Sequence, residues 1–216
     1  MAQAAGERGR RFLTGRGHAP GGRLESCIPY ASGSGPRRVG LVIIWLNGAF
    51  GAGKTTTAVE LTSRIPDSRL FDAEKVGEML WHVLGVPERD FQDFPPWRAL
   101  VVETARQVLN HTGGTLVVTQ TVLVERYWRE IHGGLVRAAI PVHHFLLHAD
   151  TRTLAERIET DAGPQSARAR RWRLDHLGDY QEALPWLRRA AEVVDTTGIT
   201  PDQAAETIMS RVRLDG

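Results

Sequence analysis

Residues 41–65 read LVIIWLNGAFGAGKTTTAVELTSRI, and this stretch decides the fold. Within it, Gly48, Gly53, Lys54 and Thr55 match the pattern G-x-x-x-x-G-K-[ST] of a phosphate-binding loop. An apolar run of strand length precedes the pattern, and an amphipathic segment compatible with a helix follows it. The stretch therefore predicts a nucleoside triphosphate site between a strand and a helix.

The residue types of this loop suit a polyphosphate. Its glycines let the backbone turn tightly and approach the phosphates, and the N–H groups of the first helical turn form an anion-binding nest. Lys54 is expected to reach the terminal phosphates, Thr55 to coordinate Mg²⁺, and Thr56 to hold an α-phosphate oxygen. We expect the cofactors ATP and Mg²⁺ on a loop formed by Gly48, Ala49, Phe50, Gly51, Ala52, Gly53, Lys54, Thr55 and Thr56. The alternative is a glycine-rich turn of another α/β protein.

The composition is that of a globular protein. The chain has 216 residues, of which 42% are hydrophobic and 24% are charged. No apolar run approaches the ~20 residues that cross a bilayer, and the single cysteine, Cys27, excludes an internal disulfide. We therefore expect a cytoplasmic protein without membrane association.

Charge is distributed unevenly along the chain. Residues 1–40 hold seven arginines against two glutamates, a net charge of +5 that leaves −3 for residues 41–216 out of the total of +2. The first segment is rich in Gly and Arg and has no helical or strand period, so we predict that it is disordered. The remainder is mildly acidic and lacks a basic face with interleaved aromatics, which argues against a nucleic-acid partner.

Beyond the loop, short apolar runs alternate with helical patterns. Strands are expected at 41–46, 69–71, 115–119, 142–147 and 193–195. The intervening segments predict helices, among them 125–136, with Gly133-Gly134 as an alternative end, and one that ends near Ala183 before Pro185. The alternation predicts an α/β fold of the P-loop NTPase type over residues 41–216, with a five-stranded parallel sheet between two helical layers, as in small-molecule kinases.

Polar side chains at the carboxyl ends of these strands are candidates for chemistry. Asp72 follows the second strand, where a carboxylate can accept the proton of a substrate hydroxyl. The alternative is that Asp72 caps the next helix. Gln120 follows the third strand and is expected to shape the acceptor pocket.

Two further segments carry candidate residues. Gln92, Trp97 and Arg98 suggest a recognition loop, because arginine binds anionic or carbonyl groups and tryptophan offers a stacking face. A buried tryptophan that anchors a helix is the alternative. Residues 161–173 form a candidate lid with four arginines, of which we expect Arg168 and Arg171 to stabilise the transferring phosphoryl group. A solvated charged helix is the alternative.

Several of these motifs together resemble the tunicamycin resistance protein family. They are IWLNGAFGAGKT at 44–55, DAEKVG at 72–77, DFQD at 90–93 with PWR at 96–98, and VHHF at 142–145. The resemblance covers roughly residues 41–212, and the layout is more distantly similar to chloramphenicol phosphotransferases and to shikimate and gluconate kinases. It implies an ATP-binding protein that acts on, or protects against, a nucleoside antibiotic.

The sequence therefore predicts an ATP-dependent phosphotransferase that modifies a hydroxyl of a nucleoside-type antibiotic such as tunicamycin. Asp72 would act as the base, Lys54 with the lid arginines would stabilise the phosphoryl group, and Trp97, Arg98 and Gln120 would shape the acceptor pocket. Two alternatives stay open: a protein that sequesters the drug without chemistry, and a housekeeping small-molecule kinase.

Overall fold

The computed structural model describes residues 41–85 and 90–212, and for residues 164–168 only the backbone. The segment 1–40, for which the sequence predicts disorder, lies outside the described residues. Within the described ranges, no helix is both long enough and apolar enough to cross a lipid bilayer.

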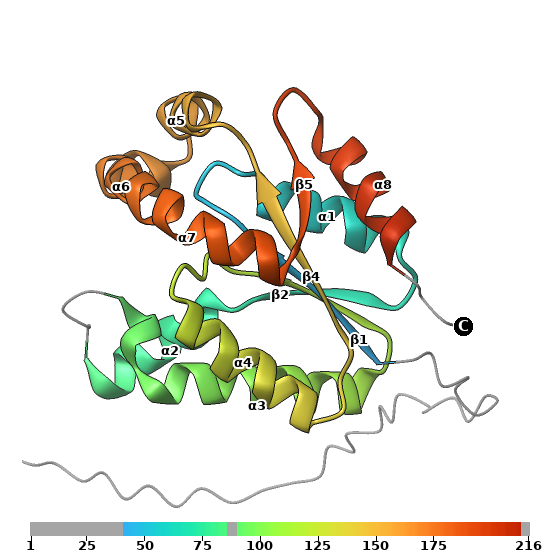
Figure 1. Ribbon diagram of the computed structural model, residues 1–216. Helices are drawn as coiled ribbons and strands as arrows, with labels where there is room; N and C mark the ends of the chain where they lie inside the picture. Colours follow the sequence, from blue (N-terminus) through green and yellow to red (C-terminus); the bar gives the residue numbers. More distant parts are fainter. Residues whose placement is uncertain (1–40, 86–89, 213–216) are drawn as a thin grey trace, which may run out of the picture. The chain divides into compact units, whose positions relative to one another are not determined.

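A five-stranded parallel sheet forms the centre of the described unit (Figure 1). Its strands lie in the order β2-β3-β1-β4-β5. Their bounds are Val42–Asn47 for β1, Ser68–Asp72 for β2, Thr115–Thr119 for β3, Val142–His148 for β4 and Glu192–Asp195 for β5. The central strand β1 is buried along its whole length, as expected for an apolar run covered on both faces of a parallel sheet.

Helices cover both faces of the sheet. On one face, α1 (Lys54–Arg64) packs against α8 (Pro201–Arg211), and on the other α3 (Pro95–Thr112) packs against α4 (Glu125–Arg137). The remaining elements are α2 (Glu74–Leu84), the 3₁₀ turn η1 (Phe91–Asp93), α5 (Thr151–Thr160), α6 (Pro164–Asp175) and α7 (Leu177–Ala190). The predicted α/β fold, with a parallel sheet between helices, is confirmed.

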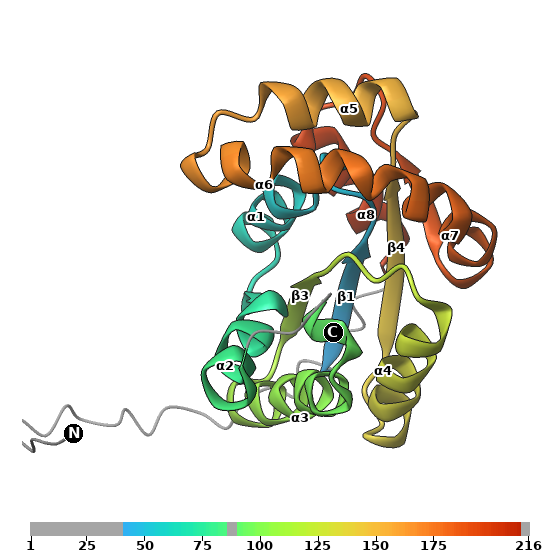
Figure 2. The ribbon, with the colours of Figure 1, turned by 90° about the vertical axis from the view of Figure 1, so that its left-hand side faces the viewer.

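The strand register brings the candidate residues to one edge of the sheet. Thr119, the last residue of β3, pairs with Leu46 of β1 on one side and with Asp72 of β2 on the other. The phosphate-binding loop, Asp72 and the segment after β3 therefore begin at the same level. Figure 2 shows α5 and α6 beyond this edge, past the carboxyl ends of β1 and β4.

Two helices run further than the glycine and proline signals predict. Helix α7 continues through Pro185 to Ala190, because its second half is held by the buried side chains of Trp186 and Leu187. Helix α4 does not end at Gly133-Gly134, since Gly134 lets α4 approach α3: a Cβ at this position would lie 2.9 Å from Val102 Cγ2. In both cases tertiary packing overrides a local signal that favours a helix end.

Candidate functional site

The loop between β1 and α1 has the backbone that its glycines predict. Gly48, Gly51 and Gly53 have φ values of 144°, 78° and 90°, in the region that side chains rarely allow. At Gly48 a Cβ would also lie 2.4 Å from the Leu147 carbonyl oxygen, so only glycine fits. The buried Asn47 fixes the loop from below, because its Oδ1 accepts the N–H groups of Gly48 and Val122 at 2.8 and 2.9 Å.

Lys54, the first residue of α1, turns back over this loop. Its Nζ donates to the carbonyl oxygens of Gly48 and Ala49, at 2.9 Å each. Burial lowers the pKa of Lys54 to about 8, with Arg173 adding in the same direction and Glu74 opposing it. A lysine held this way carries a poorly hydrated charge, which binds an anion strongly.

The two threonines after Lys54 differ in their contacts. Thr56 Oγ1 donates to the Gly53 carbonyl at 2.9 Å, whereas Thr55 is exposed and its hydroxyl has no hydrogen bond to any described residue. No group of three or more His, Cys, Asp or Glu side chains in the described part of the chain could hold a metal ion. The backbone of the loop suits a polyphosphate, and the Thr55 hydroxyl is an oxygen at the loop that could ligate a metal ion together with the phosphates.

Two carboxylates follow β2 next to this loop. Asp72 Oδ1 accepts the Glu74 N–H at 3.0 Å, so the capping role that the sequence left open is present. Glu74 lies close enough to Lys54 for each to shift the pKa of the other. Partial loss of hydration and then the negative charge of Asp72 raise the pKa of Glu74. The sequence analysis missed Glu74, although its position two residues after Asp72 was visible.

The two lid arginines selected from the sequence make no described contact with the loop. Arg171 Nε donates to both oxygens of Asp175 at 3.0 and 3.1 Å, and its side chain is 88% exposed, so in this structure it pairs with a residue of its own helix. The side chain of Arg168 lies outside the described residues. Arg173 instead reaches the loop, with its guanidinium 5.7 Å from the centre of the Phe50 ring.

A second arginine at the loop comes from α5. Arg157 donates to the Gly51 carbonyl at 3.3 Å and to the Thr196 carbonyl at 2.8 Å, and so ties the loop to the segment after β5. Arg157 also lines a pocket of about 190 Å³, here called the smaller pocket. Its other walls are the loop, the first turn of α1, the segment between β5 and α8, and the first turn of α8.

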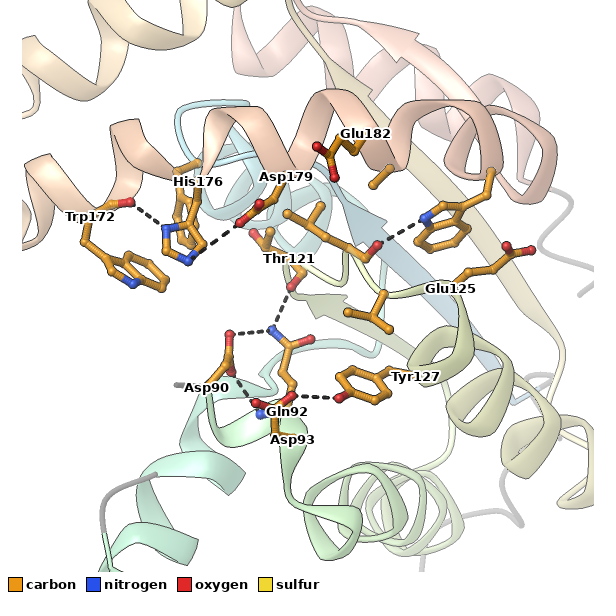
Figure 3. A pocket seen from close by; sticks show the side chains of 15 residues that line it. Asp90, Gln92, Asp93, Thr121, Glu125, Tyr127, Trp172, His176, Asp179 and Glu182 are labelled. Carbon is orange, nitrogen blue, oxygen red and sulfur yellow. Dashed lines mark hydrogen bonds and ion pairs between the residues drawn. The ribbon is translucent and has the colours of Figure 1, made fainter. Parts of the chain in front are cut away.

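A larger cavity, of about 480 Å³, is lined by Phe50 of the loop and by residues of several other elements (Figure 3). Its floor is formed by Asp90, η1 and Tyr127 of α4, and its roof by α6 and α7. The floor is tied together by hydrogen bonds: Gln92 Nε2 donates to the Thr121 carbonyl at 2.9 Å, and the Tyr127 hydroxyl donates to Asp93 at 2.6 Å. The larger cavity has fixed polar walls and opens next to the phosphate-binding loop.

Comparison with known proteins agrees with this geometry. Residues 43–184, more than half of the chain, match the protein family described as the AAA domain. The chain belongs to the AAA-domain family. No curated protein sequence is significantly similar to it.

Several solved structures are also similar to this chain. The tunicamycin resistance protein of Deinococcus radiodurans is 28% identical, with a TM-score of 0.59, over 79% of this chain and 94% of that one. This similarity confirms the resemblance that the sequence motifs indicate. A sugar kinase from Janibacter sp. HTCC2649 (18% identity, TM-score 0.56, 79% and 94% coverage) and a gluconokinase from Sinorhizobium meliloti 1021 (18%, 0.55, 81% and 94%) share the fold.

Three predicted acceptor residues of this AAA-domain chain do not line the larger cavity. Trp97 is fully buried, and its Nε1 donates to the Ala73 carbonyl at 3.1 Å, so it has no exposed stacking face. Arg98 is buried, contacts Glu130 and the Gln92 carbonyl, and lies 4.3 Å from the centre of the Tyr127 ring. Gln120 is 2% exposed, and its Oε1 has no hydrogen-bond partner among the described residues.

The placements of Trp97 and Arg98 share a physical reason. A tryptophan or arginine that follows a loop can face the ligand or anchor the helix behind it, and sequence alone does not separate the two. Here Phe91 packs on Trp97 with ring centres 5.3 Å apart, and the Arg98 guanidinium holds the carbonyl of Gln92. Trp97 and Arg98 therefore position η1, whose Gln92 does line the larger cavity as predicted from the sequence.

Proposed function

We propose that this AAA-domain protein is an ATP-dependent phosphotransferase that phosphorylates a hydroxyl of a small molecule. The observation that carries the proposal is the position of Phe50. This loop residue lines the larger cavity and packs edge-on against Trp172 of α6, with ring centres 5.0 Å apart. A molecule in the larger cavity would therefore lie directly beside the phosphates bound to the loop.

Different residues around the loop would bind different parts of ATP. The phosphates would lie on the N–H groups from Gly48 to Thr56, and the nucleoside would extend toward the smaller pocket beside Arg157. Lys54 would leave the carbonyls of Gly48 and Ala49 for the terminal phosphates. Mg²⁺, held by Thr55 and the phosphates, would supply positive charge against the charge that develops on the transferring group.

The transfer step needs a base next to the loop. The acceptor oxygen would form a bond to the γ-phosphorus while the bond to the β–γ bridging oxygen breaks, and ADP would leave with that electron pair. The proton of the acceptor hydroxyl would pass to a carboxylate at the end of β2, Asp72 or Glu74. Arg173, whose guanidinium lies 5.7 Å from the centre of the Phe50 ring, would stabilise the transferring group, the role predicted from the sequence for Arg168 and Arg171.

The first acceptor to test is tunicamycin, because the 28% identical structure is named a tunicamycin resistance protein. We expect purified protein with Mg·ATP to consume ATP faster when tunicamycin is present. Asp72→Asn and Glu74→Gln would identify the base: the variant of the base loses 10²–10⁴-fold in turnover, roughly, while ATP affinity is preserved. Full activity in both variants would exclude a carboxylate base after β2.

The outcomes also separate the alternative functions. Tunicamycin that binds without stimulating ATP consumption would indicate sequestration. A protein that does not bind tunicamycin and phosphorylates a common metabolite would be a housekeeping kinase. In that case Arg173→Gln would still test the lid role of residues 161–173. This variant should lower turnover more than it lowers ATP affinity.

A further inference from the structure

The larger cavity carries an unusual charge for a site beside a phosphate-binding loop. Among the described residues, five carboxylates line it, and His176 is the only basic side chain in that described lining. The five are Asp90, Asp93, Glu125, Asp179 and Glu182. The basic groups of the site, Lys54, Arg157 and Arg173, gather at the loop instead. The site is thus divided into a basic phosphate end and an acidic acceptor end.

The carboxylates come from both sides of the larger cavity (Figure 3). Asp90 and Asp93 belong to the floor, and Asp179 and Glu182 project from α7 in the roof. Glu182 has no hydrogen bond or ion pair with any described residue, and the contact of Asp179 is a 3.9 Å approach to His176. Glu125 differs, because it pairs with Arg129 at 2.7 Å. The two roof carboxylates therefore keep their acceptor oxygens available to a ligand.

Aromatic rings supply part of the remaining walls, next to small and aliphatic side chains. Trp172 of α6 lines the larger cavity and is 43% exposed, so one part of its indole is open. Tyr127 and Trp186 also line it, but their polar atoms are engaged with Asp93 and with the Leu123 carbonyl. Open aromatic surface together with carboxylate acceptors suits a ring that has an apolar C–H face and several hydroxyl donors.

We infer that the larger cavity selects a polyhydroxylated, carbohydrate-like acceptor that carries no negative charge. This inference rests on the proposed function and specifies its substrate class. Hydroxyl or ammonium groups of the acceptor donate to Asp179, Glu182 and the floor carboxylates, whereas a carboxylate or phosphate on the acceptor meets like charges. Acceptors such as sugar acids and sugar phosphates are therefore excluded.

The same charge arrangement favours release of the product. Phosphorylation converts the acceptor into a phosphate ester with negative charge. When the ester leaves the loop through the larger cavity, that charge passes the carboxylates of the floor and of the roof, among which His176 is the only basic side chain that the structure describes. The ester is therefore bound more weakly than the acceptor.

Glucosamine, glucose and glucuronate test this class, because they present the same pyranose ring with a positive, a neutral and a negative charge. Their binding to the full chain is measured by calorimetry in the absence of ATP. We expect glucosamine and glucose to bind at least about tenfold more tightly than glucuronate. Equal or tighter binding of glucuronate would overturn the inference, and so would the failure of all three sugars to bind at millimolar concentrations.

Two variants test whether the roof carboxylates cause the preference for uncharged and positively charged sugars. The double variant Asp179→Asn/Glu182→Gln should strengthen glucuronate binding and reduce the discrimination to less than about threefold. Glu156→Gln on α5 is the control, because Glu156 is exposed and does not line the larger cavity. An unchanged ratio in the double variant would contradict the inference. Since no ATP is present, these results stand apart from the success or failure of the phosphotransfer assay.

Discussion

The floor of the larger cavity depends on a close contact between α2 and η1, and Gly77→Ala perturbs that contact. Gly77 lies inside α2, and a Cβ there would be 2.5 Å from Phe91 Cγ and 2.7 Å from Phe91 Cδ2. Carbon atoms not bonded to each other prefer separations near ~3.5–4.0 Å. The Phe91 ring would have to move by about 1 Å, and Phe91 is the first residue of η1.

The size of the effect follows from two opposing contributions. Overpacking of this kind lowers the free energy of unfolding by about 1–3 kcal/mol. Replacing glycine by alanine inside a helix raises it by about 1 kcal/mol. Gly133→Ala in α4 is the matched control, because its Cβ would meet only the flexible end of Arg137 at 3.3 Å. The free energy of unfolding of Gly77→Ala should therefore lie about 1–3 kcal/mol below that of Gly133→Ala.

Urea unfolding followed by tryptophan fluorescence measures this difference, provided that the m-values agree. The displacement of η1 should also weaken tunicamycin-stimulated ATP consumption, while ATP affinity stays within about twofold of the wild type because the loop is untouched. A Gly77→Ala variant as stable as Gly133→Ala, with full acceptor-dependent activity, would refute the claim that this contact positions the cavity floor.

Three further predictions concern Lys54, Asp72 and Arg98. Because burial lowers the pKa of Lys54 to about 8 from 10.5, ATP affinity in calorimetry should fall as the pH rises through about 8. Between pH values of about 8 and 10.5, Lys54 binds its proton more strongly in the unfolded state than in the folded state. The free energy of unfolding of the wild type should therefore rise with pH over this range relative to that of Lys54→Met. Opposite or absent trends would contradict the burial of this ammonium. Asp72→Asn keeps a side-chain oxygen that can accept the Glu74 N–H, so the melting temperature should stay within about 2 °C of the wild type. A large fall in the melting temperature would show that the negative charge of Asp72, and not this hydrogen bond, stabilises the fold. Arg98→Met leaves the Gln92 carbonyl without its donor and should lower the free energy of unfolding by about 1–3 kcal/mol in urea titrations; an unchanged midpoint would argue against the anchoring role of Arg98.

The fold could be predicted from the sequence because its signals are local and agree with one another. Continuous apolar runs mark the buried strands, as at Thr115–Thr119, and the glycine pattern places the loop before Lys54. Thr200 provides a capping box that begins α8, another signal contained within a few residues of sequence. The end predicted before Pro185 was wrong, and the alternative end at Gly133-Gly134 is not used; both outcomes depend on packing against distant residues, which a local pattern does not contain.

The acceptor side of the site was less predictable, for a different reason. Its floor and roof come from segments that lie far apart in the sequence, and Asp179 and Glu182 look like ordinary exposed residues of a helix. Trp97 and Arg98 stood out by their residue type, yet the structure uses both to support η1. Which arginine reaches the loop also depends on the rotation of α6, which directs Arg171 to Asp175 and Arg173 to Phe50.

The central claim is that the loop and the larger cavity together transfer a phosphoryl group. Mass spectrometry of tunicamycin after incubation with the protein and Mg·ATP labelled with ¹⁸O in the γ-phosphate tests it most directly. The account predicts a product heavier by one labelled phosphoryl group, about 80 Da plus the label, which is lost with Lys54→Ala. Tunicamycin recovered unchanged while it remains bound to the protein would contradict phosphotransfer to this drug and would indicate sequestration.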